Sequence, residues 1–184
     1  KHMGMLSKGH VKEVDRADLV AQYIGQTAPR VKKVIDEARG GILFVDEAYA
    51  LTRSGDDSND FGPEVIEILL KEMSDGKGDL AIMFAGYPKE MDNFTDSNPG
   101  LRSRISYHYN FPDYLPEELM SICEFSAGKH KVSLTTDALR ELKEYITEAY
   151  RARDEAFGNA RYANSIITEA KMNIAVDTAL SLAS

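Results

Sequence analysis

The sequence predicts an α/β fold in which a doubly wound parallel sheet is followed by a small all-helical subdomain. Short apolar runs at residues 42–45 and 80–85 are typical of strands that are buried on both faces. Segments with helical periodicity separate these runs, and strands that alternate with helices favour a parallel sheet. After Pro112 the chain contains mainly amphipathic helical patterns. We therefore expect subdomains at residues 1–113 and 114–184.

The first subdomain is expected to begin with two short elements and a longer helix. Residues 9–14 alternate between polar and apolar side chains and predict a short strand, and residues 15–20 begin a short helix or turn. Thr27 can cap the longer helix, Pro29 suits its first turn and Gly40 can end it. The apolar face of this helix is predicted to consist of Val31, Val34, Ile35 and Ala38.

The rest of the first subdomain is expected to contain two more strands. Pro63 suits the first turn of a helix that precedes the buried strand at residues 80–85. A short helix follows, and the polar stretch at residues 97–104 indicates a loop. Alternating side chains at residues 107–111 then predict a last strand.

The second subdomain is expected to consist of three amphipathic helices. They are predicted at residues 116–130, 136–153 and 161–182, and residues 132–134 form a short extended piece between the first two. The apolar stripe of the third helix is predicted to contain Ile166, Ile167, Ala170, Ile174, Ala175 and Leu182.

The composition narrows the possible classes of protein. The 184 residues suit one domain with a small helical appendage, and a hydrophobic fraction of 43% suffices for a core. A net charge of −8 argues against non-specific electrostatic binding to nucleic acid or to an anionic membrane. The single cysteine, Cys123, excludes an internal disulfide framework and a zinc cluster built from cysteines. No apolar run approaches the ~20 residues of a membrane span and no secretory signal is present, so the default expectation is a cytoplasmic location.

Two acids stand where a ligand site is expected in a parallel sheet. Asp46 and Glu47 directly follow the apolar strand at residues 42–45. The carboxyl ends of strands face the ligand crevice in open α/β sheets, and carboxylates are rarely buried unless they pair or hold a metal. The two acids therefore suit a magnesium ligand and a group that activates water, although an acidic turn without a function gives the same pattern.

Six motifs follow one another along almost the whole chain. They lie at residues 19–29, 41–51, 84–87, 98–104, 111–114 and 157–161. Together they resemble the AAA+ ATPases, and within these the branch of CbbX/CfxQ and sporulation protein K. The resemblance implies a P-loop NTPase fold of the AAA+ type. It also implies a ring motor, expected to be a hexamer, that binds and hydrolyses ATP with Mg²⁺ and remodels a protein partner.

The same resemblance assigns roles around the phosphates of ATP. Residues 41–51 are similar to a Walker B segment, in which Asp46 would hold Mg²⁺, mostly through water, and Glu47 would polarise the attacking water. Tyr87 falls at the sensor 1 position and would be cofactor-binding, although many members of the family carry Asn or Thr there.

Three arginines complete this set by resemblance. Arg102 and Arg104 lie where an arginine finger would reach the nucleotide of a neighbouring subunit, and we favour Arg104. Arg161 matches the sensor 2 arginine of the helical lid, with Gly158 as the expected cap of the preceding helix. The alternatives for Arg102 and Arg104 are a surface arginine that contacts no phosphate or a salt bridge within the same chain. The alternative for Arg161 is ordinary helix-start chemistry.

Tyr23, Ile24 and Gly25 resemble a pore loop. An aromatic ring next to a flexible glycine suits gripping a threaded chain, because the ring offers apolar contact without sequence demands. The alternative is that Tyr23 belongs to the core. The acidic loop at residues 53–60 would be a second pore loop or a solvated surface loop.

One part of the family pattern is absent from these 184 residues: they contain no strand with a G-x-x-x-x-G-K-[ST] loop. That segment was removed, is supplied by another chain or is omitted from the sequence. Without it we expect weak or absent ATP binding. The alternative function is a non-catalytic AAA+ scaffold. A nucleic-acid-handling member of the family is disfavoured by the negative charge.

Overall fold

The computed structural model describes residues 4–52, 60–76, 78–154 and 157–183. The chain divides into two compact units, Lys1–Asn110 and Phe111–Ser184. Each unit has its own hydrophobic core and is described by itself. In the part of the chain that the structure describes, no helix has the length and apolar character needed to cross a membrane.

The first unit is built on a parallel sheet. Its strands β1 (Val11–Val14), β2 (Ile42–Val45) and β3 (Ala81–Phe84) lie in the order β1-β2-β3. The register aligns Val14 with Val45 and Val45 with Phe84, so the carboxyl ends of the three strands meet at one edge. The prediction of a parallel α/β sheet is confirmed.

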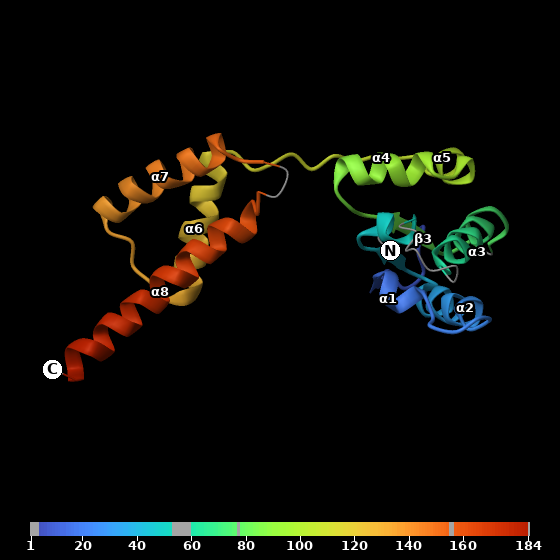
Figure 1. Cartoon of the computed structure of the whole chain (residues 1–184), viewed down its shortest axis with the longest axis horizontal. Coiled ribbons are helices and arrows are strands. Elements are labelled where there is room, and N and C mark those ends of the chain that lie inside the picture. Colours follow the sequence, from blue (N-terminus) through green and yellow to red (C-terminus); the bar gives the residue numbers. More distant parts are fainter. Residues whose placement is uncertain (1–3, 53–59, 77, 155–156, 184) are drawn as a thin grey trace. The chain divides into compact units, whose positions relative to one another are not determined.

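Helices pack on this sheet and on one another (Figure 1). They are α1 (Arg16–Leu19), α2 (Thr27–Ala38), the 3₁₀ helix η1 (Ala48–Thr52), α3 (Gly62–Asp75), α4 (Pro88–Asp96) and α5 (Pro99–Arg104). The predicted apolar face of α2 is buried, and it joins β2 and α3 in one core. The largest fully buried side chains of this core are Phe94, Leu19, Leu43, Leu51, Leu69 and Leu101.

Two predictions about strands are wrong. β3 is not buried on both faces, since Met83 is 48% exposed and no side chain of the strand is fully buried. Residues 107–111 form no strand, and Tyr107 and Tyr109 are exposed. A strand needs a hydrogen-bonded neighbour, and among the described residues neither the outer edge of β3 nor this aromatic segment has one. The alternating pattern alone could not show that.

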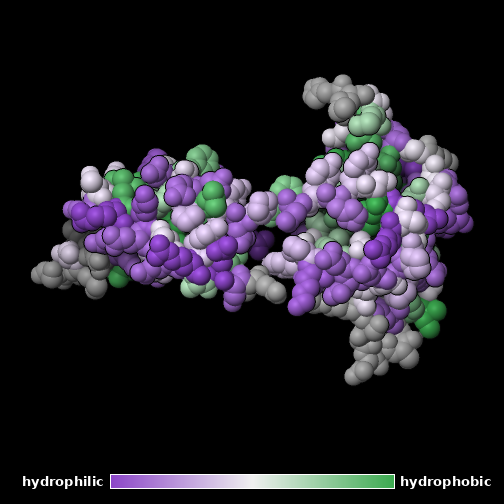
Figure 2. Space-filling view, turned by 90° about the horizontal axis from the view of Figure 1, so that it is seen from above, coloured by the Kyte–Doolittle hydropathy of each residue, from purple (hydrophilic) through white to green (hydrophobic). Residues whose placement is uncertain are grey.

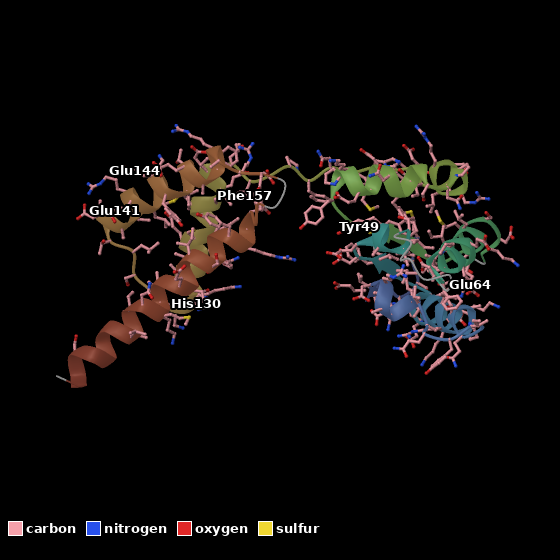
Figure 3. All side chains as sticks on the ribbon, viewed as in Figure 1. Tyr49, Glu64, His130, Glu141, Glu144 and Phe157 are labelled. Carbon is pink, nitrogen blue, oxygen red and sulfur yellow. The ribbon has the colours of Figure 1, made fainter. Side chains whose placement is uncertain are left out.

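The second unit is helical, as predicted. It consists of α6 (Pro116–His130), α7 (Thr136–Arg151) and α8 (Ala160–Ala183), and α6 contacts both other helices. Its buried side chains are Leu119, Cys123, Ala127, Leu142, Ile146, Ala163 and Ile167. Glu141 and Glu144 lie on the exposed side of α7 (Figure 3).

Cys123 is fully buried against α8, and its thiol lies 3.4 Å from the carbonyl oxygen of Ala163. Burial, with a smaller contribution from Glu124, raises the pKa of Cys123 to about 11. A thiol that stays protonated is a poor nucleophile, so Cys123 acts as an apolar core residue. Figure 2 shows that the visible face of each unit is mostly hydrophilic, in keeping with the 28% of charged residues in the chain.

Candidate functional site

The candidate site lies at the edge where the carboxyl ends of β1 and β2 meet. Asp15 and Arg16 follow β1, and Asp46 and Glu47 follow β2. The backbone N–H of Asp46 donates to the carbonyl oxygen of Val14 at 2.9 Å. The parallel register therefore brings together four charged residues that are about 30 positions apart in the sequence.

Asp46 presents an exposed carboxylate, and one of its oxygens accepts the N–H of Glu47 at 3.0 Å. It lines a small hollow of about 160 Å³ together with Glu13, Asp15 and Asp18. No group of three His, Cys, Asp or Glu side chains in the described residues is arranged to hold a metal ion. A single exposed carboxylate is a donor that Mg²⁺ can use when water or phosphate supplies its other oxygens.

Glu47 adopts a left-handed backbone, with a φ of 46°. That conformation is uncommon for residues other than glycine and is often found at functional sites. Hydrogen bonds on both sides fix the turn: Ala48 N–H donates to Ala85 at 3.0 Å, and Ala50 N–H donates to the Glu47 carbonyl at 2.8 Å. The exposed carboxylate is therefore carried on a well-determined turn between β2 and η1.

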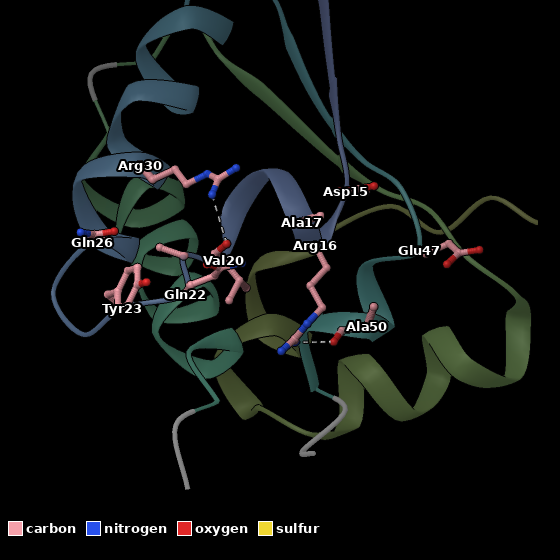
Figure 4. A pocket seen from close by; sticks show the side chains of 11 residues that line it. Asp15, Arg16, Ala17, Val20, Gln22, Tyr23, Gln26, Arg30, Glu47 and Ala50 are labelled. Atoms are coloured by element: carbon pink, nitrogen blue, oxygen red, sulfur yellow. Dashed lines mark hydrogen bonds between the residues drawn. The ribbon is translucent and has the colours of Figure 1, made fainter. Parts of the chain in front are cut away.

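Glu47 and Tyr23 line the same hollow, which has a volume of about 740 Å³ (Figure 4). Its wall is formed by α1, the segment between α1 and α2, and the turn after β2. The other lining residues are Asp15, Arg16, Ala17, Val20, Ala21, Gln22, Gln26, Arg30 and Ala50.

The segment proposed by resemblance to be a pore loop is exposed. Tyr23 and Ile24 are 67% and 79% exposed, so the alternative of a core tyrosine is contradicted. Gly25 has a φ of 79°, and nothing lies within 4 Å of the position that a side chain would take there. This arrangement leaves an aromatic and an aliphatic side chain free to contact a partner. The second candidate pore loop, at residues 53–60, lies outside the described residues except for Asp60.

Arg102 and Arg104 lie on α5, not in the loop that the sequence suggested. The polar stretch forms a helix because Pro99 occupies its first turn and the Asn98 side chain accepts the N–H of Gly100 at 2.8 Å. Arg102 forms an exposed ion pair with Asp96 at 3.0 Å.

Arg104 has a different environment from Arg102. Its Nε donates to Ser74 Oγ at the end of α3, and its Nη1 donates to the carbonyl oxygen of Gly100 at 3.3 Å. Within the described ranges, no carboxylate pairs with Arg104. Among the described residues, neutral groups therefore hold the Arg104 guanidinium in place.

Tyr87 follows β3 and is the residue before the first turn of α4. The register of β2 and β3 places it after the same edge of the sheet as Asp46. Its side chain is 55% exposed. The structure brings Asp46, Glu47 and Tyr87 to one edge, while Arg161 belongs to the second unit.

Arg161 is exposed in the first turn of α8, and its N–H donates to the Gly158 carbonyl at 2.9 Å. The prediction that Gly158 caps the preceding helix is wrong. That helix, α7, ends at Arg151, and Gly158 lies just before the start of α8. Asn159, the residue before α8, has a left-handed backbone with a φ of 51°. Its side chain donates to Asp113 at 2.8 Å and accepts the N–H of Tyr114 at 3.1 Å.

This contact joins two of the sequence motifs, at residues 111–114 and 157–161, within the second unit. The Phe157 ring packs on Tyr162 at a centroid distance of 5.5 Å (Figure 3). The start of α8, and with it the backbone of Arg161, is therefore fixed from two sides.

Sequence reasoning missed Arg16 and Asp60, which form an ion pair at 2.8 Å. The two side chains are 32% and 13% exposed. Burial raises the pKa of Asp60, but hydrogen bonds from Arg16 and from the Gly62 N–H outweigh it and hold this pKa below its usual value. The available signal was that Arg16 lies two residues after the end of the predicted strand at residues 9–14.

A pH prediction follows from the lowered pKa of Asp60. Its carboxylate should contribute to stability above its unfolded pKa of about 4 and lose that contribution as the pH falls through its lower folded pKa. We expect the difference in unfolding free energy between the wild type and Asp60→Asn to be constant at neutral pH and to shrink below about pH 4. Urea titrations at several pH values measure it, and a difference that grows at acidic pH would contradict the assignment.

A parallel sheet with two adjacent acids at its carboxyl edge, followed by a helical unit, has the architecture expected of an ATPase domain with a helical lid. Residues 2–113 match the model of the ATPase family associated with various cellular activities (AAA), and residues 115–181 match the AAA lid domain. The chain belongs to the AAA family.

Curated relatives support this placement. The chain is 45% identical to "Ribulose bisphosphate carboxylase/oxygenase activase, chloroplastic" of Cyanidioschyzon merolae, over 92% of this chain and 57% of that protein. It is 44% identical to protein CbbX of Cereibacter sphaeroides, over 92% of this chain and 54% of that protein. The chain thus spans a little more than half the length of these relatives.

The fold is also similar to that of a solved protein, a mutant of RuvB from Thermotoga maritima. The TM-score is 0.62 at 16% identity, and the match covers 92% of this chain and 48% of RuvB. At this identity the similarity supports the fold only.

Proposed function

We propose that this chain is the Walker B, pore-loop and lid portion of an ATP-hydrolysing AAA+ ring motor that remodels a protein partner. The observation that carries the proposal is the turn after β2. It holds Asp46 and the left-handed Glu47 at the carboxyl edge of the sheet, and Glu47 lines a hollow together with the exposed Tyr23.

The residues at this edge fit Mg²⁺ and ATP. Asp46 would provide one exposed carboxylate to the metal, and Glu47, which lines the hollow, would orient a water and accept its proton. Bound Mg²⁺ would neutralise charge on the phosphates. Tyr87 and Arg161 would contact the nucleotide. Arg104, which pairs with no carboxylate in the described part of its unit, would act in trans.

A P-loop is the remaining requirement of this function. Its backbone and lysine cradle the phosphates in P-loop ATPases, and residues 1–184 contain no such motif. We therefore expect the chain alone to bind ATP weakly. A preceding strand could pair with the open edge of β3, where Met83 is half exposed.

The partner is proposed to be a protein that is pulled through the pore of a hexameric ring. Tyr23 and Ile24 project from the segment between α1 and α2 and offer apolar contact without sequence demands. Since relatives are named Rubisco activase and CbbX, Rubisco is the first substrate to test.

Tyr23→Ala tests the pulling role in a ring that carries this chain behind a P-loop segment. We expect ATP hydrolysis within about twofold of the wild type, because the phosphate site is unchanged. Most of the remodelling activity should be lost, because the aromatic side chain that contacts the threaded chain is missing. Reactivation of inhibited Rubisco, measured beside ATPase activity, reports both quantities.

Phe125→Ala is the matched control, since Phe125 on α6 is 65% exposed, as much as Tyr23. It should leave remodelling unchanged. Full remodelling by Tyr23→Ala would remove the pore-loop role and leave the ATPase proposal standing.

A further inference from the structure

Arg16 connects three segments that lie far apart in the sequence. Its Nη1 donates to the carbonyl oxygen of Ala50 in η1 at 2.7 Å, and its Nη2 donates to Asp60 at 2.8 Å. The same Asp60 oxygen accepts the N–H of Gly62, the first residue of α3, at 2.9 Å. One guanidinium therefore joins α1, the helical turn after Glu47 and the start of α3.

The fit around Arg16 is close. A side chain carbon added at Gly62 would lie 2.9 Å from Arg16 Nη1 and would collide with the carbonyl oxygen of Leu51. Only a residue without a side chain lets α3 begin this near to Arg16 and η1. The planar fork of arginine reaches both acceptors at once, which the single ammonium of lysine does not do.

The backbone links Arg16 to both sides of the hollow. On one side Ala50, whose carbonyl oxygen accepts from Arg16, donates its own N–H to Glu47 at 2.8 Å. On the other side the Arg16 carbonyl accepts the N–H of Val20, which begins the segment that carries Tyr23. In Figure 4 Arg16 lies between Tyr23 and Glu47.

The start of the Tyr23 segment is also bonded to α2. The buried N–H of Ala21 donates to Thr27 Oγ1 at 3.2 Å, and Arg30 donates to the Val20 carbonyl at 3.4 Å. Movement of α1 would therefore reach the Tyr23 segment through its first residues, Val20 and Ala21.

We propose that Arg16 is a positioning residue that couples the Glu47 turn to the Tyr23 segment and to the start of α3. This inference rests on the proposed function. In that function, a shift of the Glu47 turn on ATP hydrolysis would reach Tyr23 through Arg16 and α1. Arg16 itself touches neither water nor threaded chain in this role.

Amide hydrogen exchange of the full 184-residue chain tests the connection without nucleotide. The reporters are the N–H groups of Ala50 for the Glu47 turn and of Ala21 for the Tyr23 segment. In Arg16→Gln both should exchange about tenfold faster, because a charge-assisted pair of hydrogen bonds is lost. The N–H of Asp46, bonded to β1, should be unaffected.

Arg39→Gln is the matched control, because Arg39 pairs with Glu72 at 2.9 Å and the two side chains are 28% and 17% exposed. It should leave both reporters unchanged. Arg16→Lys, which keeps the charge without the fork, should protect the reporters less than arginine does. If Arg16→Gln does not fold, Asp60→Asn replaces it and should speed both reporters to a smaller extent.

Three results would overturn the proposal: acceleration of only one reporter, equal acceleration at Asp46, or full protection by Arg16→Lys. In a ring with a P-loop, Arg16→Gln should lower kcat and leave KM for ATP unchanged, and an unchanged kcat would remove Arg16 from positioning Glu47. The exchange result does not depend on ATP hydrolysis, so it can fail while the proposed function stands.

Discussion

Arg104→Ala is expected to lower kcat for ATP hydrolysis by about 10³-fold or more in a ring that carries this chain behind a P-loop, because an arginine finger supplied in trans has an effect of that size. ATP affinity should stay largely intact, since the P-loop of the same subunit holds the nucleotide. Arg104 suits this role because, in the described part of its unit, only serine and backbone oxygens accept its hydrogen bonds.

Arg102→Ala provides the control. Arg102 already pairs with Asp96 on α4, and an exposed pair of this kind contributes little to stability. We expect kcat to change less than about threefold. Steady-state turnover and nucleotide titration of both variants measure the contrast, and a larger loss in Arg102→Ala would reverse the assignment of the finger.

Glu47→Gln is expected to lower kcat by about 10²- to 10⁴-fold, the usual contribution of a general base. Glutamine keeps the size of the side chain but cannot accept a proton at neutral pH. Nucleotide binding and ring assembly should persist, because Glu47 is exposed and makes no ion pair in the described part of the chain.

Glu64→Gln tests whether any acid near this sheet would have the same effect. Glu64 lies in the first turn of α3 (Figure 3), away from the residues that line the hollow. Its replacement should leave kcat unchanged. Hydrolysis by Glu47→Gln at more than a tenth of the wild-type rate would remove Glu47 as the base.

Local patterns predicted the parts of the fold that do not depend on distant partners. The apolar spacing of α2 predicted its buried face. The apolar run of β2 predicted a strand, but only Leu43 and Val45 are buried, while Ile42 and Phe44 are half-buried. The position of Asp46 and Glu47 followed from one rule about strand ends. The left-handed conformation of Glu47 could not be predicted in this way. It depends on the hydrogen bonds from Ala48 to Ala85 and from Ala50 to Glu47, which no local pattern encodes.

Features that depend on a neighbour in space escaped the sequence. The aromatic alternation at residues 107–111 suggested a strand, but a ladder also needs a partner strand. Arg16 looked like an ordinary residue of a short helix, since Asp60 and Ala50 are 44 and 34 positions away. α5 was missed because the polar stretch at residues 97–104 indicated a loop, whereas Asn98 caps a short helix there.

Titration of Mg²⁺–ATP tests the central claim most directly, which is that the acids at the carboxyl edge act on a nucleotide that a P-loop must hold. The 184-residue chain and the same chain behind a strand and P-loop would be compared by calorimetry. We predict micromolar binding only with the P-loop, with hydrolysis that depends on Glu47. Micromolar binding by the 184 residues alone would contradict the account.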